Sequence, residues 1–531
     1  MSTDAVRGGA ARAVESVAPV LAASGRPVSG PADGIPPGYG RRWTAVVAGF
    51  PALVMLICGL IGIGDRQLWR DEHATWWAAT QVSTTDFVRL LSHIDIVFAP
   101  YYSYMRLWTA VFGDSAPALR LPSLLWMSVA AALLGLLGRR LYDAPTGLLA
   151  GLIFAILPTV SRYAAEARPY AQTLAVTIGA TLLLLRALDR PRPRRWVWYA
   201  LAVVAVGLSH LVALAVLVAH ALLVLGEVRG QDRRIVVRRF RPWLLAVVVG
   251  LAPVVPVVFQ ARQQSHQIVW ILPPEPLDLL RLPGELFGSR SVAIVLFFVA
   301  LVGLAVSRWP SLALSAWILV APALTYLTFD QFQLFYHRYL LFTVPAWVLL
   351  AAAGTLWMAR LGQAAPVPDG RPVLRPALSV AAGALALALV AGYGLAGHRF
   401  VRSDLLEDEH AFRAAAGFVR THAREGDGIA YSNYRYLRRA FAYELRHDPR
   451  PIDVFLDVPP AENGWYHAEE CGRPARCLGD VRRIWWVSTR LGPDPLDREP
   501  GRIGDLLRDR FVVAQVVEFH KIWVLELVAR E

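Results

Sequence analysis

The stretch from Trp43 to Gly64 reads WTAVVAGFPALVMLICGLIGIG and contains no charged residue. A helix needs about 20 predominantly apolar residues to cross the hydrocarbon core of a bilayer, and this stretch is long enough. The polar sequence Trp69-Arg70-Asp71-Glu72-His73 follows shortly after it. The stretch therefore predicts a first membrane span that delivers two adjacent carboxylates to the membrane surface.

The composition of the whole chain agrees with a membrane protein. Its 531 residues are 55% hydrophobic and 18% charged, with a mean hydropathy of +0.41, which excludes one soluble globule with a polar surface. The net charge of +13 does not indicate nucleic-acid binding, because the arginines cluster in short runs beside apolar stretches, as in cytoplasmic membrane loops. Lys521 is the single lysine, which with abundant Ala, Gly and Pro indicates a bacterial gene of high GC content.

Apolar segments of sufficient length predict eleven spans, and the fold class is therefore mainly α, a polytopic helical membrane protein. The expected spans lie near residues 43–64, 117–138, 144–162, 170–188, 196–210, 211–226, 243–260, 292–307, 311–329, 339–358 and 376–396. The fifth and sixth could also be drawn as one long helix. Two helices place all the arginine-rich loops on one side, which the positive-inside rule assigns to the cytoplasm together with the N-terminus.

The spans divide the chain into three parts. Residues 1–40 are expected to form a disordered cytoplasmic tail, 41–397 a membrane domain with a long outer loop at 65–116, and 398–531 an extracytoplasmic domain. Helix-like stretches at 408–423 and 434–445 alternate with strand-like ones at 428–432, 482–488, 511–519 and 522–528, which predicts a small α/β domain. Leucines near 277–287 suit a helix lying in the membrane interface, although four prolines leave an irregular loop as the alternative.

The few cysteines allow one structural bond at most. Cys471 and Cys477 lie close together in the expected extracytoplasmic domain, where an oxidising compartment would permit a disulfide. Two unpaired thiols remain the alternative.

Asp71 and Glu72 are the first candidates for chemistry. A carboxylate in a partly dry pocket at the membrane surface can accept the proton of an incoming hydroxyl. The alternative is a pair of solvated carboxylates beside an interfacial belt formed by Trp69, Trp76 and Trp77.

Further polar groups fall at the same depth. Glu166-Ala-Arg-Pro-Tyr170 lies between the third and fourth spans, and its Arg168 could bind a phosphate through two parallel hydrogen bonds. A Glu–Arg ion pair that closes a helical hairpin is the alternative. His210 interrupts the apolar run between the fifth and sixth spans, and Tyr336-His337-Arg338-Tyr339 opens the tenth. Arg338 suits a lipid phosphate, or it is a cation that extends to the headgroups.

Motifs between these groups occur in a definite order. The acidic pair is followed by His93-x-Asp95, Pro100-Tyr101-Tyr102, Phe112-Gly-Asp-Ser115 and Leu119-Arg-Leu-Pro-Ser123, and later by Glu166 to Tyr170, His210 and His337-Arg338-Tyr339. As a set, over residues 43–396, they resemble bacterial GT-C glycosyltransferases, the relatives of protein O-mannosyltransferases and aminoarabinose transferases. One departure is Phe98-Ala99-Pro100, where many relatives have two prolines before the tyrosines.

The resemblance implies a bacterial plasma-membrane enzyme that moves a mannose- or arabinose-like sugar, with inversion, from a polyprenyl-phosphate carrier to a glycan, protein or lipid acceptor. It implies that Asp71 is the general base, while Glu72 and Glu166 position substrates or, if the enzyme uses one, a divalent metal. Arg168 and Arg338 would stabilise the leaving phosphate. Other expected substrate- or donor-phosphate-binding residues are His93, Asp95, Tyr101, Tyr170, His210 and His337.

Two other functions fit a polytopic chain with a phosphate site. A transporter or flippase for a lipid-linked glycan would place charges near the bilayer midplane and show repeated halves. Here the charged groups gather at one surface and no hydropathy repeat is evident. An assembly or receptor protein would leave the acidic and arginine sites without a role, so the enzyme is favoured.

Overall fold

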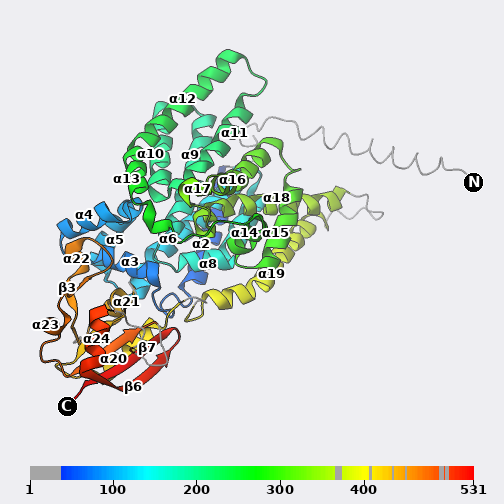
Figure 1. Cartoon of the computed structure of the whole chain (residues 1–531). Coiled ribbons are helices and arrows are strands. Elements are labelled where there is room, and N and C mark those ends of the chain that lie inside the picture. The colour runs from blue at the N-terminus through cyan, green and yellow to red at the C-terminus, as the bar shows by residue number, and fades with distance from the viewer. Residues whose placement is uncertain are drawn as a thin grey trace, which may run out of the picture.

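The computed structural model describes residues 37–364, 374–405, 409–432, 436–448, 451–489, 496 and 501–531. Figure 1 shows a bundle of helices with a small sheet domain at one end. The hairpin between α11 (Val216–Val228) and α12 (Arg233–Leu251) lies at the other end. Of the tail expected at 1–40, residues 1–36 fall outside the described part, and Pro37 to Gly40 already belong to α2 (Pro37–Leu60).

The structure confirms a helical membrane domain. Among the described residues, eight helices are long and apolar enough to cross a membrane, and two bent helix pairs bring the total to as many as ten. The eight are Arg42–Leu60, Ala116–Leu141, Tyr170–Asp189, Leu211–Val228, Arg233–Gln263, Trp309–Leu327, His337–Leu361 and Ala377–Val401. The remaining expected span, 196–210, is α10 (Pro193–Ser209), whose 17 residues make it short for a bilayer core.

The membrane domain contains further helices, both long and short, besides those that follow the first span. They are α6 (Ala116–Leu141), α7 (Ala144–Ala155), α8 (Pro158–Ala164), α9 (Tyr170–Asp189), η3 (Leu211–Ala215), η4 (Ala252–Val254), α13 (Val255–Gln263), η5 (Ser265–Ile268), α14 (Pro276–Phe287), α15 (Arg290–Gly303), α16 (Arg308–Leu327), α17 (Phe329–Phe332), η6 (His337–Thr343), α18 (Val344–Ala364) and α19 (Leu374–Val401).

The two expected spans at 144–162 and 292–307 are parts of bent helix pairs. α7 and α8 meet at 67°, where Pro158 begins the second helix, and α14 and α15 meet at 101°. Gly288 joins the second pair with φ +68°, and a Cβ there would lie 2.6 Å from Oγ1 of Thr159. Since a side chain at this position would be strained and would clash, glycine permits the sharp turn. The prediction of a helix near 277–287 is confirmed, and the irregular loop is wrong.

Extended backbone at His210 separates α10 from η3 and α11. The fifth and sixth segments are therefore two helices, as the arginine pattern predicts. Small residues let the neighbouring helices pack closely. A Cβ on Gly147 of α7 would lie 2.2 Å from the backbone oxygen of Gly135 in α6, so these two helices touch through their backbones.

Short helices replace the expected outer loop at 65–116. They are α3 (Arg70–Ala79), α4 (Thr84–His93), η2 (Ile96–Phe98) and α5 (Ala99–Phe112). Their apolar side chains form a separate small core that also includes Tyr443 of the C-terminal domain. In Figure 1 this group lies between the bundle and the sheet domain.

The C-terminal domain is α/β, as predicted. Its five-stranded sheet has the order β2-β1-β5-β7-β6, parallel among the first three strands and antiparallel among the last three. The strands are β1 (Gly428–Tyr431), β2 (Ile452–Asp453), β5 (Arg483–Ser488), β6 (Phe511–Phe519) and β7 (Ile522–Ala529), with a separate pair β3 (Leu456–Val458) and β4 (Glu469–Glu470). The helices are α20 (Phe412–His422), α21 (Leu437–Glu444), α22 (Pro460–Asn463), α23 (Pro474–Leu478) and α24 (Gly501–Arg510).

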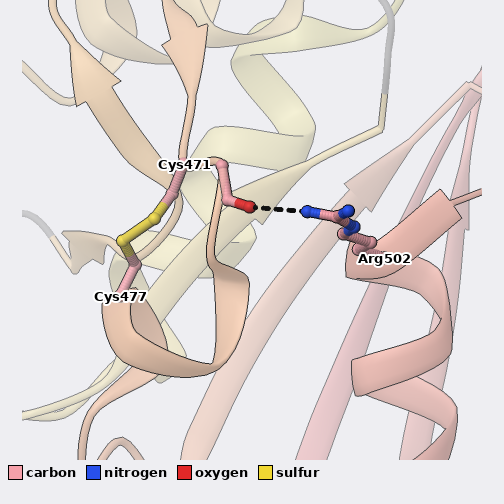
Figure 2. The surroundings of a disulfide bond; sticks show 4 residues. Cys471, Cys477 and Arg502 are labelled. Carbon is pink, nitrogen blue, oxygen red and sulfur yellow. Dashed lines mark hydrogen bonds between the residues drawn. A yellow bond between two sulfur atoms is a disulfide. The ribbon is translucent and has the colours of Figure 1, made fainter.

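Both faces of this sheet are covered. Trp485 and Trp486, neighbours on β5, are each 1% exposed and belong to different apolar clusters, because successive strand residues point to opposite faces. Cys471 and Cys477 form a disulfide. Figure 2 shows it beside the chain segment whose Gly472 carbonyl accepts a hydrogen bond from Arg502 of α24 at 3.2 Å. The two unpaired thiols considered above are therefore excluded.

Candidate functional site

Asp71 and Glu72 lie in the first turn of α3, directly after its N-cap residue Trp69. Carboxylates are favoured there because the exposed N–H groups and the helix dipole carry partial positive charge. α3 packs against α5 and against α21 of the C-terminal domain. Neighbouring residues on a helix point in different directions, and the two carboxylates accordingly have different surroundings.

Glu72 is completely buried and bound to Arg120 of α6. The Nε atom of Arg120 donates to Oε1 at 2.8 Å, and its Nη2 donates to Oε2 at 2.7 Å. The backbone N–H of Ala167 donates to Oε1 at 2.9 Å. Burial alone would raise the pKa of Glu72, but the adjacent Arg120 guanidinium lowers it below its usual value. Glu72 thus ties α3 to α6 and to the turn before α9.

Asp71 is the more accessible of the two, with a side chain that is 27% exposed. Its Oδ2 lies 3.0 Å from Nη1 of Arg338, at the start of η6. Burial would raise the pKa of Asp71, but Arg338, and then Arg168, outweigh burial and hold this pKa below its usual value. The carboxylate is therefore ionised at neutral pH, and part of its surface remains open to a substrate.

Aromatic rings surround the guanidinium of Arg338. Its central carbon lies 4.9 to 5.8 Å from the ring centroids of Trp69, Trp270, Tyr336 and Tyr339. Ring faces attract cations, so they stabilise this buried charge. Its Nε has no hydrogen-bond partner among the described residues. Arg338 therefore has a donor to spare beside Asp71.

Arg168 begins a chain of polar contacts that reaches the C-terminal domain. Its Nη1 donates to the hydroxyl of Tyr102 at 3.0 Å, and the guanidinium lies over the ring of Phe98. The hydroxyls of Tyr102 and Tyr466 both donate to Oδ2 of Asp95, at 2.8 and 2.7 Å. Asp95 therefore organises these tyrosines, and Nε of Arg168 remains without a partner in the described part of the chain.

Glu166 is buried differently from Glu72. Its nearest cation is Arg162, with Nε 3.6 Å from Oε2, and neither carboxylate oxygen has a hydrogen-bond partner within the described ranges. Burial raises the pKa of Glu166, partly offset by Arg162 and Arg66. Glu166 therefore pairs with Arg162, which precedes it, and not with Arg168 as the alternative considered above supposes.

His210 and Tyr170 lie beside the aromatic group around Arg338. The ring of His210 is 5.2 Å from that of Tyr339 and 6.3 Å from that of Tyr170. His337 points elsewhere, since its Nδ1 lies 3.4 Å from Oε2 of Glu285 on α14. It is placed to hold α14 against η6.

Tyr101 and His93 are on the periphery of this group. Tyr101 is 3% exposed with its ring 6.1 Å from that of Tyr102, and burial raises its pKa. His93 is exposed at the end of α4, where its ring stacks on Trp465 of the C-terminal domain at 5.5 Å. The structure therefore brings Asp71, Arg168, Tyr170, His210 and Arg338 together, and leaves His93 and His337 at the edge.

Known proteins share this architecture. The crystal structures of ArnT from Cupriavidus metallidurans, bound to undecaprenyl phosphate and in the apo state, match with TM-scores of 0.53 and 0.55. Both are 15% identical to this chain, and the match covers 92% of it and 98% of ArnT. The chain has a GT-C fold. The arabinofuranosyltransferase AftD from Mycobacteria matches less well, with a TM-score of 0.48, 16% identity, and coverage of 92% of this chain and 40% of AftD.

Sequence comparison of the GT-C chain gives a more limited result. The family model described as dolichyl-phosphate-mannose-protein mannosyltransferase matches residues 99–259, less than half of the chain. No curated protein sequence matches. The matched segment runs from α5 to α13, and it contains Glu166, Arg168, Tyr170 and His210 but not Asp71.

The GT-C site also contains residues that sequence reasoning did not select. Arg120 belongs to the Leu119–Ser123 motif, and no role was predicted for it. An arginine at the start of a span nevertheless indicates a buried ion pair. Arg439 comes from the C-terminal domain, more than 300 residues along the chain from Arg70 and Asp71. No local pattern connects residues so distant.

Glu72 and Glu166 do not form a metal site in this GT-C fold. Both oxygens of Glu72 accept hydrogen bonds from Arg120, and Arg162 is the nearest partner of Glu166. The described part of the chain contains no group of three or more His, Cys, Asp or Glu residues that could hold a metal ion. These residues do not fit a resident divalent cation.

Proposed function

We propose that the chain is an integral membrane glycosyltransferase that moves a sugar, with inversion, from a polyprenyl-phosphate carrier to an acceptor outside the cytoplasm. The observation that carries the proposal is the pair Asp71 and Arg338, an ionised and partly exposed carboxylate beside a buried guanidinium. The GT-C fold, shared with a protein that binds undecaprenyl phosphate, supports the choice of donor.

Asp71 is proposed as the general base. It removes the proton from the acceptor hydroxyl, whose oxygen attacks the anomeric carbon from the side opposite the phosphate. The bond between that carbon and the phosphate oxygen breaks, and its electron pair leaves with the lipid phosphate. The sugar is thereby transferred with inversion, and the proton remains on Asp71.

Arg168 and Arg338 are proposed to stabilise the departing phosphate. The phosphate gains one negative charge when the bond breaks, and pre-positioned guanidinium groups lower the energy of that charge. Each of these arginines has a buried Nε without a partner in the described residues. Tyr170 and His210, beside Arg338, are proposed to line the donor pocket, and Asp95 and Tyr101 support its wall.

Glu72 and Glu166 are proposed to have positioning roles. Glu72 holds the first turn of α3 through Arg120, and so fixes the backbone of Asp71. Glu166 lies two residues before Arg168 and pairs with Arg162. His337 is proposed to position Arg338, its neighbour in sequence, through Glu285. His93 is proposed to contact the acceptor near Trp465.

The family match bears on the sugar of the donor, and the disulfide bears on the orientation of the chain in the membrane. The family match to mannosyltransferases supports a mannose-like sugar, and an arabinose-like sugar is the other candidate. The disulfide supports an oxidising compartment for the C-terminal domain, and the arginine-rich loops support a cytoplasmic N-terminus in a bacterial plasma membrane. A glycan, a protein or a lipid could serve as the acceptor.

The test uses full-length protein in nanodiscs with polyprenyl-phosphate mannose and polyprenyl-phosphate arabinose, each labelled in the sugar, and a cell-envelope fraction as acceptor. We expect one donor to yield free polyprenyl phosphate and labelled acceptor, and Asp71→Asn to yield neither. A flippase for a lipid-linked glycan would instead move the intact donor across proteoliposomes. That result, without free polyprenyl phosphate, would overturn the proposal.

A further inference from the structure

Arg439 extends from the C-terminal domain toward Asp71. It lies on α21 and is 4% exposed, and its Nη2 donates to the backbone oxygen of Arg70 at 3.1 Å. Arg70 directly precedes Asp71 in the first turn of α3. The positive charge of Arg439 also lowers the pKa of Asp71, against the effect of burial and by less than Arg338, Arg168 and Arg70 do.

The guanidinium of Arg439 has two donor groups that no residue in the described structure accepts from. Its Nε and Nη1 are buried and have no hydrogen-bond partner among the residues that the structure describes. Leaving a charged donor buried and unpaired costs free energy, so unpaired donors on a buried guanidinium call for a partner that the described residues do not supply. Arg446, also at the junction of the domains, is different, because Asp114 pairs with it at 3.2 Å.

Aromatic side chains hold Arg439 in place. Its guanidinium lies 4.5 Å from the ring centroid of Tyr466 and 5.6 Å from that of Tyr436. Tyr466 is fixed by the hydrogen bond to Asp95, and Asp95 also accepts from Tyr102, the partner of Arg168. Arg439 and Arg168 therefore belong to one connected network around Asp71.

Arg338 and Arg439 approach Asp71 from different parts of the protein. Arg338 begins a membrane-spanning segment, His337–Leu361, whereas Arg439 belongs to the C-terminal domain. A lipid-linked donor must enter from the membrane, so its phosphate meets Arg338 first. A water-soluble acceptor group approaches from the side of the C-terminal domain, where Arg439 lies.

We propose that Arg439 is an acceptor-binding residue that recognises an oxyanion of the acceptor, a carboxylate or a phosphate, through Nε and Nη1. A guanidinium suits this role because it can donate two parallel hydrogen bonds to such a group. The inference rests on the proposed function, in which Arg168 and Arg338 bind the donor phosphate. It gives the C-terminal domain a direct part in the choice of acceptor.

The experiment measures two binding events on the full chain in nanodiscs. Polyprenyl phosphate is first titrated to saturation, which occupies the donor site, and then inorganic phosphate or acetate is added in separate calorimetric titrations. We expect wild-type protein to bind at least one of these two anions. Arg439→Gln should weaken that binding about tenfold or more, which corresponds to about 1.4 kcal/mol, while polyprenyl-phosphate affinity stays unchanged.

Two variants serve as controls for folding and domain docking. Arg439→Lys keeps the charge but not the parallel donors, and should recover part of the affinity. Arg446→Gln removes another arginine from the domain junction and should leave anion binding at the wild-type level. The preference for phosphate or acetate identifies which oxyanion the acceptor carries.

Several results would overturn the inference. These are that neither anion binds the saturated wild-type protein, that Arg439→Gln binds as the wild type does, or that Arg446→Gln loses binding equally, which would show an effect of docking. Loss of polyprenyl-phosphate binding in Arg439→Gln would instead assign Arg439 to the donor. The first titration tests the proposed function separately. If wild-type protein does not bind polyprenyl phosphate there, that result counts against the proposed function.

Discussion

Nη1 of Arg338 lies 3.0 Å from Oδ2 of Asp71, and this contact joins the start of a membrane-spanning segment to the first turn of α3. The two residues are far apart in sequence and lie on different helices, Asp71 on α3 and Arg338 on η6. The contact keeps a carboxylate ionised next to a guanidinium that still has an unpaired Nε in the described structure. One pair of side chains thus combines the carboxylate proposed as the proton acceptor with a guanidinium proposed to bind phosphate.

Asp71→Asn should abolish sugar transfer and leave expression intact. An amide cannot accept the proton of the acceptor hydroxyl, so turnover should fall at least about a hundredfold. Release of free polyprenyl phosphate by purified protein is the measurement. Asp86→Asn is a matched control, because Asp86 lies on α4 and pairs with Arg89 near the surface. Wild-type turnover in Asp71→Asn would refute its assignment as the base.

The pH dependence of transfer should reflect the low pKa of Asp71. A base with a depressed pKa is ionised above that pKa, and activity is lost only as the pH falls through it. We therefore expect no acid limb from Asp71 between about pH 5 and pH 8, the range in which most proteins are stable. Its limb lies below pH 3.8, the ordinary value for an aspartate.

Arg338→Gln should move that acid limb to higher pH. The substitution removes the largest influence that lowers the pKa of Asp71, while burial, which raises it, remains. The measurement is the pH profile of the residual activity, each value scaled to its own maximum. An unchanged limb with reduced turnover would mean that Arg338 acts on the phosphate alone.

Glu72→Gln should destabilise the protein. It leaves the buried guanidinium of Arg120 without its counter-charge, and breaking such a pair costs on the order of 3 to 5 kcal/mol. The melting temperature in detergent should fall clearly. Asp278→Asn is the comparison, since its ion pair with Arg281 is exposed and such pairs contribute about 0 to 1 kcal/mol. Equal melting temperatures for the two variants would contradict a structural role for Glu72.

Reduction of the disulfide should loosen the C-terminal domain. The bond closes a loop over a sequence separation of 6, for which chain entropy predicts about 2 kcal/mol of stabilisation. Cys471→Ser with Cys477→Ser should lower the unfolding temperature of this domain, followed by near-ultraviolet circular dichroism at its buried tryptophans. Cys58→Ser is the control, because Cys58 is unbonded in the described part of the chain. No shift in the double variant would show that the bond contributes nothing.

The membrane helices could be predicted because their cause is local. A bilayer requires a long apolar run wherever a helix crosses it, and the runs near Trp43–Gly64 and elsewhere satisfy this without reference to distant residues. The period of two in strands likewise predicted β5, β6 and β7. The bends at Pro158 and Gly288 were missed, because packing against neighbours decides where a helix turns.

The sequence by itself determined a polytopic helical protein with a small α/β domain, and it singled out Asp71, Arg168 and Arg338 as polar groups near one membrane surface. The tertiary structure alone decided that Glu72 is bound to Arg120, that Asp71 faces Arg338, and that Arg439 joins them from the C-terminal domain. The reason is physical. Hydropathy acts along the chain within one helix, whereas ion pairs form between side chains that only folding brings within a few ångströms.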